Sequence, residues 1–158
     1  MATIAPVALR PEALPLELFD HLVAVALAHQ QDGGMIEVVL IEDDAGMRQA
    51  IARILSGNGF AIHAFESAED LLATLDEDDC AARARCLVCD IRLPGMSGLE
   101  LHRRVGERGA TPPWVFITAH DDRILREQAE RAGAAYLMKP FEGRALLALV
   151  ARMVPTPG

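Results

Sequence analysis

The sequence predicts an α/β fold: a doubly wound parallel sheet of five strands, with an added helix near the N-terminus. Three observations support this fold class. Five short apolar segments recur along the chain, a segment with helical spacing follows each of them, and the apolar segments lack the polar alternation of a half-exposed strand. Strands of a parallel sheet are covered on both faces and therefore have nearly continuous hydrophobic sequences.

The first unit is a strand at 36–41, where only Glu37 interrupts the apolar run, followed by a helix at 45–55. Four apolar residues of that helix recur at intervals of three and four, which is the pattern of a helix with one buried face. The helix is expected to end at the Gly-Asn-Gly sequence that begins at Gly57, because glycine readily terminates helices.

The second unit is a short strand at 61–65 and a helix that runs to about Leu75. Ser67, with Asp70 three residues later, resembles a capping box, in which side chains at the two positions satisfy free N–H groups at the start of a helix. A helix is therefore expected to begin directly after Ser67.

The last three units repeat the pattern. Their strands are predicted at 86–89, 114–117 and 134–138, and their helices at 99–105, 121–132 and 144–153. Gly133 directly follows the second of these helices, so it is expected to cap the C-terminal end of that helix. The last helix is unusually poor in charge, since Arg144 and Arg152 are its only charged residues.

Length and composition limit the function classes. A chain of 158 residues with 51% apolar side chains can form one domain with a packed core. The formal charge of −8 and the pI near 5.0 argue against direct nucleic-acid binding, which would need a basic stripe. Since the sequence has neither a secretory leader pattern nor an apolar run of about 18 residues, we predict a cytoplasmic protein without membrane contact.

The cysteines predict neither disulfides nor a metal site. Their number is three, which does not make a disulfide framework. Cys86 and Cys89 have the spacing of a metal-binding pair, but they lie on a predicted strand, where residues three apart point to opposite faces. We therefore expect buried structural thiols.

Polar side chains follow four of the predicted strands at their carboxyl ends. They are Glu42, Asp43 and Asp44 after the first strand, Asp90 after the third, Thr118 after the fourth, and Lys139 with Pro140 after the fifth. Ligands of open parallel sheets bind outside the carboxyl ends of the strands. These acids, the hydroxyl and the ammonium group are thus expected to meet in one place, as in a phosphorylatable aspartate site.

The chemistry of such a cluster indicates a divalent ion. Two carboxylates about 4 Å apart repel by roughly 4 kcal/mol at an effective dielectric constant of about 20, so several at one site need a cation or a change of protonation. Mg²⁺ prefers oxygen ligands and is often held by carboxylates together with phosphate oxygens. The ion and Lys139 would neutralise charge while Asp90 acts as the nucleophile, and Thr118 could hydrogen-bond a phosphoryl oxygen.

Four motifs resemble the receiver domain of the response regulators of bacterial two-component signalling. They are VLIEDD at 38–43, LVCDIRLPGMSGLEL at 87–101, FITAH at 116–120 and AGAAYLMKPF at 132–141. Each motif alone is weak, but their order and separations make the resemblance specific. It covers residues 35–154 and implies the flavodoxin-like (β/α)5 fold of receivers.

The resemblance also implies roles for single residues. Asp90 would accept the phosphoryl group, and Glu42 and Asp43 would bind Mg²⁺ with Asp90. The further implied roles are a metal ligand from the backbone carbonyl of Arg92, a switch hydroxyl from Thr118, a phosphate-pairing Lys139 and a rotating aromatic, Tyr136. In the family, the positions of Arg92 and His120 border the path of the hydrolytic water, and Pro140 follows a cis peptide bond, although sequence alone favours trans.

The implied function is that of a stand-alone, phosphorylation-controlled signalling switch, not an enzyme with a separate substrate. Its partners would be a histidine kinase or phosphotransfer protein and a downstream protein target, and a homodimer stays open. The alternative is the receiver half of a DNA-binding transcriptional regulator whose effector domain is absent from this chain. FITAHDD and the SAED segment favour this alternative, because they resemble receivers of nitrogen-fixation and nitrate-response regulators.

Three enzyme classes fit less well. A haloacid-dehalogenase-type phosphatase also uses an aspartate after a strand, but it needs a second acid two residues later, where this chain has Arg92. The glycine-rich sequences of dinucleotide-binding and P-loop proteins are absent.

Residues 1–34 form a predicted N-terminal extension, and residues 155–158 form a short tail. A helix is predicted between 15 and 30, because apolar side chains recur there as a wide stripe. The stripe consists of Leu18, Phe19, Leu22 and Val25. Such a surface needs cover, and three covers stay open: the last helix of the same domain, a second copy of the chain, or a partner protein.

Overall fold

The computed structural model describes residues 35–109 and 112–154. The predicted domain at 35–154 is thus described almost completely. The N-terminal helix predicted between 15 and 30 and the tail at 155–158 lie outside the described residues.

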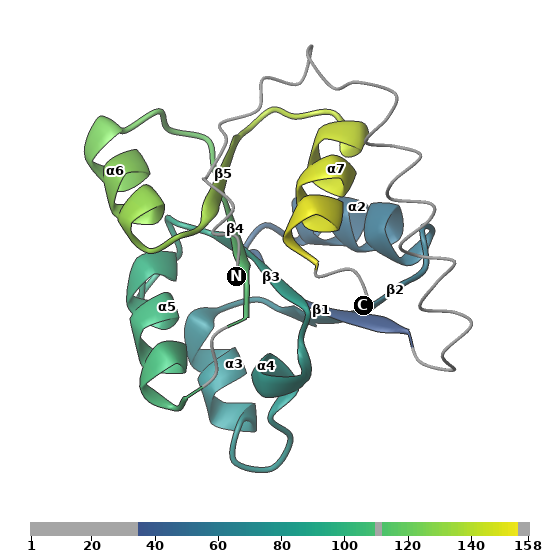
Figure 1. The fold of residues 1–158 in the computed structure, drawn as a ribbon, viewed down its shortest axis with the longest axis vertical. Coiled ribbons are helices and arrows are strands. Elements are labelled where there is room, and N and C mark those ends of the chain that lie inside the picture. Colours follow the sequence, from purple (N-terminus) through teal and green to yellow (C-terminus); the bar gives the residue numbers. More distant parts are fainter. Residues whose placement is uncertain (1–34, 110–111, 155–158) are drawn as a thin grey trace.

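The described chain forms a five-stranded, all-parallel sheet with helices on both faces (Figure 1). The strands are β1 (Ile36–Ile41), β2 (Phe60–Phe65), β3 (Cys86–Asp90), β4 (Trp114–Thr118) and β5 (Ala135–Met138). The helices are α2 (Ala45–Ser56), α3 (Ala68–Thr74), α4 (Cys80–Arg83), α5 (Gly98–Glu107), α6 (Arg123–Arg131) and α7 (Gly143–Met153). The predicted doubly wound parallel sheet is confirmed, and each strand ends within one residue of its predicted bounds.

One element was not predicted from the sequence. Helix α4 is a single turn between α3 and β3, and the Asp79 side chain caps it by accepting a hydrogen bond from the Ala82 N–H at 3.0 Å. Its four residues are too few for a helical repeat of apolar positions to be visible.

The strand order β2-β1-β3-β4-β5 brings the ends of β1 and β3 together. The chain moves outward from β1 to β2 and then returns across β1 to form β3. The winding direction therefore reverses between β1 and β3. Such a reversal leaves a crevice at the carboxyl ends of the two strands, where ligands of this fold class bind. The register pairs Ile41 with Cys89, which places the residues after β1 beside Asp90.

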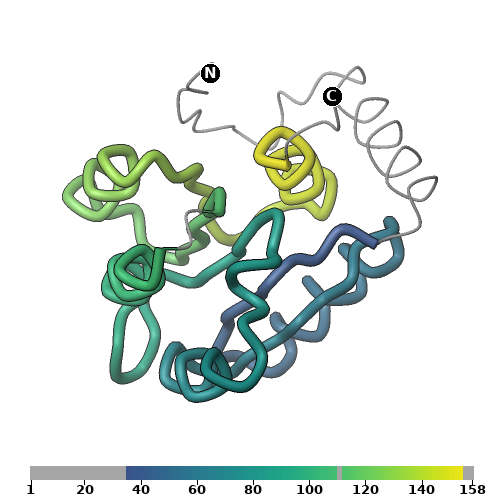
Figure 2. The backbone as a smooth tube through the Cα atoms, turned by 60° about the horizontal axis from the view of Figure 1, so that its bottom comes forward, coloured from purple at the N-terminus to yellow at the C-terminus, as the bar shows by residue number. Residues whose placement is uncertain are grey.

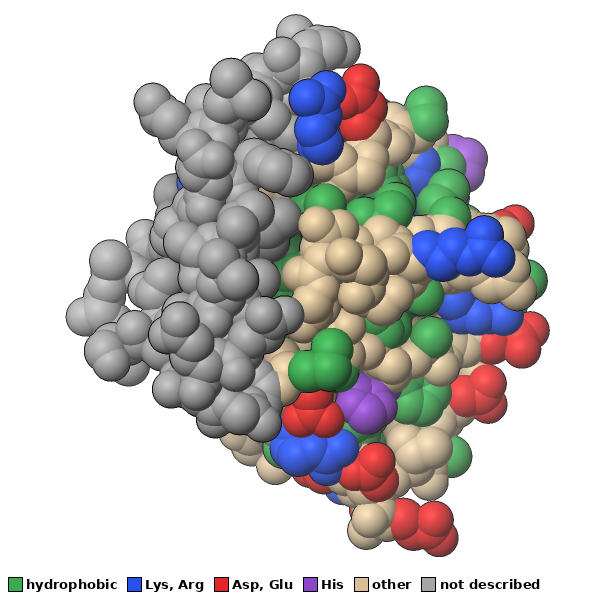
Figure 3. Space-filling model, turned by 90° about the vertical axis from the view of Figure 1, so that its right-hand side faces the viewer, with side chains coloured by type: hydrophobic (Ala, Val, Ile, Leu, Met, Phe, Trp, Pro, Cys, Tyr) green, Lys and Arg blue, Asp and Glu red, His purple; other side chains and the backbone are tan. Residues whose placement is uncertain are grey.

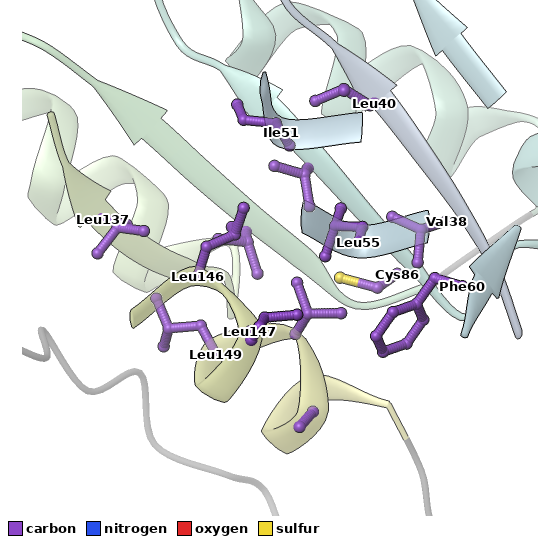
Figure 4. Packing of buried hydrophobic residues seen from close by; sticks show 14 of the residues in the cluster. Val38, Leu40, Ile51, Leu55, Phe60, Cys86, Leu137, Leu146, Leu147 and Leu149 are labelled. Carbon is purple, nitrogen blue, oxygen red and sulfur yellow. The ribbon is translucent and has the colours of Figure 1, made fainter. Parts of the chain in front are cut away.

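Two hydrophobic cores lie on opposite faces of the sheet. Helices α2 and α7 cover one face, where Ile51 and Leu55 from α2 and Leu146 from α7 belong to one core with apolar side chains of the strands (Figure 4). Helices α3, α4, α5 and α6 cover the other face, with Leu71 and Leu101 in the core. Figure 2 follows the same layers from a second direction. Both faces of the central strands are buried, which explains their continuous apolar sequences.

The cysteines lie as predicted, on opposite faces of β3. Cys86 belongs to the core beneath α2 and α7, whereas Cys89 belongs to the core beneath α3 and α5. Both are buried free thiols, and burial raises the pKa of Cys86 to about 12. The expectation of buried thiols is confirmed.

The loop ends are fixed by helix caps that the sequence partly predicted. Ser67 accepts a hydrogen bond from the Asp70 N–H at 3.0 Å, which confirms the predicted start of α3. Gly133 has φ +74°, and its N–H donates to the Glu130 carbonyl, so it caps α6 as predicted.

Helix α5 begins with a glycine because no larger residue fits there. A Cβ atom at Gly98 would lie 2.5 Å from the carbonyl oxygen of Asp90 and 3.0 Å from the Cys89 sulfur. The start of α5 thus packs closely against the main chain at the end of β3, and this contact helps to fix the position of Asp90.

The imidazole of His102 on α5 packs edge-on against Trp114, with 5.1 Å between the ring centroids. Burial lowers the pKa of His102. A folded-state pKa below the unfolded value near 6.5 means that the stability from neutral His102 is present above about pH 6.5 and is lost as the pH falls through the folded pKa.

We therefore expect the unfolding midpoint of the wild type to fall more steeply than that of His102→Leu between about pH 7 and pH 5. The fluorescence of Trp114, the only tryptophan, can report unfolding in both proteins. Equal pH slopes would show that His102 does not contribute to the pH dependence.

In the described residues, no helix is long and apolar enough to cross a membrane. Acidic and basic side chains are mixed on the described part of the face in Figure 3, instead of forming a basic stripe.

Candidate functional site

The predicted site residues meet at the carboxyl edge of the sheet. Glu42 and Asp43 follow β1, Asp90 ends β3, Thr118 ends β4 and Lys139 follows β5. One oxygen atom from each of the three carboxylates lies within 4.8 Å of the other two. Glu42, Asp90 and Thr118 are the buried polar residues of the described chain, so they form a polar site inside an otherwise apolar fold.

Asp90 is held in place through both carboxylate oxygens. Its Oδ1 accepts a hydrogen bond from the Arg92 N–H at 2.9 Å, and its Oδ2 accepts one from Lys139 Nζ at 2.9 Å. The carboxylate is mostly buried at the mouth of the crevice. These two hydrogen bonds fix the orientation of the carboxylate.

Lys139 provides a positive charge inside the carboxylate cluster. Its Nζ donates to Glu42 at 2.8 Å as well as to Asp90. Burial disfavours the charged ammonium, but the hydrogen bonds to both carboxylates outweigh this effect and raise the pKa of Lys139. Lys139 is the only lysine of the chain. Repulsion between Asp90 and Glu42 is thus offset by a cation of the chain itself.

Glu42 is the most deeply buried of the three acids. Burial raises its pKa, and the nearby Asp90 charge adds to this effect, while the hydrogen bond from Lys139 acts against it. Its Oε1 also accepts a hydrogen bond from the Asp44 N–H at 3.2 Å. A buried acid of this kind is stable as a charged group only beside a cation.

Asp44 has a structural role, although it belongs to the same acidic run. Its Oδ1 accepts a hydrogen bond from the Met47 N–H at 2.8 Å, so it caps helix α2. It is exposed and lies outside the cluster that Glu42 and Asp43 form with Asp90. Of the three acids after β1, only the first two therefore join the site.

Thr118 and Tyr136 meet at the main chain of His120. The Thr118 hydroxyl accepts a hydrogen bond from the His120 N–H at 3.2 Å, and the Tyr136 hydroxyl donates to the His120 carbonyl at 3.2 Å. The Tyr136 ring is buried, and the Arg126 guanidinium stacks over it at 5.4 Å from the ring centroid. The two predicted switch residues are thus linked through the main chain of one residue, His120.

The loop that follows Asp90 is fixed from two sides. The Arg92 side chain pairs with Asp122, the cap of α6, at 3.5 Å near the surface. Glu69 on α3 accepts a hydrogen bond from the Met96 N–H at 2.6 Å, and this bond lowers the pKa of Glu69. The Lys139–Pro140 peptide bond is cis, as the resemblance implies.

Sequence reasoning missed two supporting residues, Arg48 and Glu69. Arg48 donates to the Glu42 carbonyl at 2.8 Å, and Glu69 holds the loop after Asp90. Arg48 had one detectable signal, because a basic residue early in a helix is unfavourable next to the positive end of the helix dipole. Glu69 had no such signal, because acids are common in a first helical turn.

Comparison with known proteins identifies the family. Residues 38–151 match the response regulator receiver domain. The chain belongs to this family. The receiver therefore comes from two-component signalling, as the four motifs indicated, and the predicted fold agrees with the family.

Several relatives of the receiver are transcriptional regulators by name. FixJ of Rhizobium meliloti is 35% identical over 116 residues, which cover 73% of this chain and 55% of FixJ. DctD of Pseudomonas aeruginosa, a C4-dicarboxylate transport transcriptional regulatory protein, is 39% identical over 117 residues, which cover 73% of this chain and 24% of DctD. The chain thus spans about half or less of the length of these relatives.

Solved structures agree with the fold of the receiver. The crystal structure of FixJ-N has a TM-score of 0.66 at 33% identity and covers 77% of this chain and 94% of its own. The chemotaxis protein CheY4 of Vibrio cholerae has a TM-score of 0.68 at 22% identity, with 76% of this chain and 99% of CheY4 covered. The second likeness supports the fold alone.

The acidic cluster is suited to a metal ion. Glu42, Asp43 and Asp90 offer oxygen atoms only, at the edge of the crevice. Hard divalent cations bind such oxygen sets, whereas softer metals prefer sites with nitrogen or sulfur. The site residues therefore fit the kind of ion that their chemistry predicted.

Proposed function

We propose that this receiver is a phosphorylation-controlled switch that accepts a phosphoryl group on Asp90. One observation carries the proposal: the buried Asp90 carboxylate is fixed by Arg92 and Lys139 beside two further acids. This arrangement combines a positioned nucleophile with the means to neutralise charge, which are the main requirements of phosphoryl transfer.

We infer that the ion at the site is Mg²⁺, held by Glu42, Asp43, Asp90 and the backbone carbonyl of Arg92. When bound, Mg²⁺ supplies neutralisation of the negative charge on the phosphoryl oxygens. Lys139 is close enough to both Asp90 and Glu42 to supply a second positive charge at the same place.

The transfer step follows from the position of Asp90. One of its carboxylate oxygens attacks the phosphorus atom of a phosphohistidine on a histidine kinase or phosphotransfer protein. The new O–P bond forms as the P–N bond breaks, and the electron pair of that bond stays on the imidazole nitrogen of the donor. Lys139, released from Asp90, can then pair with a phosphoryl oxygen.

Signal output requires that phosphorylation favours a second conformation. Moving a population from 1:99 to 99:1 takes about 5.5 kcal/mol of differential binding. Thr118 is suited to contribute, because its hydroxyl could donate to a phosphoryl oxygen in place of the His120 carbonyl, which it contacts at 3.5 Å. A shift of His120 would disturb the hydrogen bond from Tyr136, which carries the change toward α6 and β5.

The output is assigned to protein–protein contact, with a downstream protein as the target. The second candidate is the receiver half of a DNA-binding transcriptional regulator. Its support is that FixJ and DctD are transcriptional regulators by name and that this chain spans only part of each. A longer sequence of the same gene product, with a DNA-binding domain after residue 158, would decide for the second candidate.

The switch is tested by comparing wild type with Thr118→Ala. Both proteins should take up phosphoryl label from acetyl phosphate with Mg²⁺, because Thr118 is not the nucleophile. In the wild type, amide NMR signals of α6 and β5 should shift on phosphorylation, and in Thr118→Ala most of this shift should be lost. Thr74→Ala at the end of α3 is the matched control and should behave as wild type. Full shifts in labelled Thr118→Ala would refute the role of Thr118.

A further inference from the structure

The Arg48 side chain folds back from helix α2 onto the loop that carries two site acids. Its Nη1 donates to the Glu42 carbonyl at 2.8 Å and approaches the Asp43 carbonyl at 3.4 Å. Its own main-chain N–H donates to the Asp44 carbonyl at 2.8 Å. One residue thus contacts three successive carbonyl groups of the loop between β1 and α2.

This position is unfavourable for an arginine unless it has a specific partner. The positive end of the helix dipole disfavours a cation early in a helix, and immobilising a long side chain loses conformational entropy. Arg48 is nevertheless partly buried, with its guanidinium on main-chain carbonyls. The hydrogen bonds to these carbonyls can offset the unfavourable dipole and entropy effects.

The Asp43 carboxylate depends on the main chain for its direction. Glu42 is held through its own carboxylate by Lys139 and the Asp44 N–H. In contrast, within residues 35–109 and 112–154 no hydrogen bond is found to the Asp43 carboxylate, although one of its oxygens lies in the cluster with Asp90. The peptide groups that Arg48 contacts therefore set where this carboxylate points.

We propose that Arg48 is a positioning residue for the divalent-ion site. It fixes the peptide groups of Glu42 and Asp43 so that both carboxylates face Asp90 before the ion binds. The inference rests on the proposed function, because it assumes that this acidic cluster binds Mg²⁺.

Positioning and simple electrostatics make opposite predictions for Arg48→Ala. Removing a positive charge near the acids should strengthen cation binding if charge alone mattered. If Arg48 positions the loop, its removal should weaken binding, because residues that orient metal ligands typically contribute about 10- to 100-fold to metal affinity. The sign of the change therefore separates the two effects.

The experiment measures Mg²⁺ affinity by isothermal titration calorimetry and Mn²⁺ affinity by electron paramagnetic resonance on the full chain. Arg48→Ala should bind both ions about tenfold more weakly, and Arg48→Lys should recover part of the loss by keeping a donor. Arg53→Ala is the control, because it removes the same charge from an exposed position of the same helix. It should bind the ions as the wild type does, or slightly more tightly.

A second readout needs no metal. In the metal-free protein, the amide NMR signals of Glu42 and Asp43 should move in Arg48→Ala and stay in place in Arg53→Ala. Should Arg48→Ala not fold, Arg48→Met, which keeps the aliphatic stem, takes its place in both measurements. In Arg48→Ala, the rate of phosphoryl labelling at saturating Mg²⁺ should stay near that of the wild type, while the Mg²⁺ concentration for half-maximal labelling should rise.

The outcomes distinguish this inference from the proposed function. Equal or tighter ion binding by Arg48→Ala, beside a wild type that binds Mg²⁺, would overturn the role of Arg48 alone. A wild type that binds neither Mg²⁺ nor Mn²⁺ would instead overturn the proposed metal site itself.

Discussion

Asp90→Asn should abolish phosphoryl labelling and leave the fold intact. The side-chain amide is not a nucleophile toward phosphorus, yet its oxygen can still accept the hydrogen bond from the Arg92 N–H that Asp90 accepts at 2.9 Å. The measurement is incorporation of radiolabelled phosphoryl from acetyl phosphate with Mg²⁺, together with an amide NMR spectrum as a test of folding. The expected incorporation is at background level.

The matched control for this prediction is Asp44→Asn. Asp44 lies at the same edge of the sheet but caps helix α2, and asparagine is an equally good cap. Labelling of Asp44→Asn should therefore equal that of the wild type. Wild-type labelling of Asp90→Asn would show that another residue accepts the phosphoryl group.

Lys139→Ala should reduce the stability of the metal-free protein by about 3 kcal/mol, because removing one partner of a buried ion pair leaves the other charge uncompensated. Here the remaining partner is Glu42, whose side chain is 1% exposed, with Asp90 beside it. Protonation of Glu42 would limit the loss, since burial already raises its pKa. Urea unfolding without divalent ions measures the change.

Magnesium should reverse part of this loss. Among the described side chains, Lys139 is the cation that pairs with the Glu42 and Asp90 carboxylates, so adding Mg²⁺ should stabilise Lys139→Ala more than it stabilises the wild type. Lys139→Met keeps most of the side-chain volume and should behave as Lys139→Ala does if charge is the cause. An unchanged stability, or a loss that Mg²⁺ does not reduce, would show that Lys139 does not act as the internal counter-charge.

The strands and the placement of the site could be predicted from the sequence, because both depend on local patterns. Apolar runs of strand length define the sheet, and the alternation with helices makes it parallel. The carboxyl ends of parallel strands share one edge, so Asp90, Thr118 and Lys139 had to be neighbours.

The supporting contacts could not be predicted, because they join residues without any periodic relation. Glu69 meets Met96 only when α3 and the loop after β3 have packed. Arg48 bonds to main-chain carbonyls, which carry no sequence signal of their own. The sequence predicted that Lys139 would neutralise charge beside the acids, but only the structure shows that its ammonium group donates to both Asp90 and Glu42.

Side-chain caps hold some, but not all, of the loops at the carboxyl edge of the sheet. Asp44, Ser97 and Asp122 each accept a hydrogen bond from a main-chain N–H at the start of α2, α5 or α6, which ties down the loops after β1, β3 and β4. Among the described helices, α7 alone starts without a side-chain cap, at Glu142. Lys139 lies in the segment between β5 and α7. Of the loops after β1, β3, β4 and β5, this one alone leads into a helix without a side-chain cap. We expect local opening, seen as faster amide hydrogen exchange, to begin there.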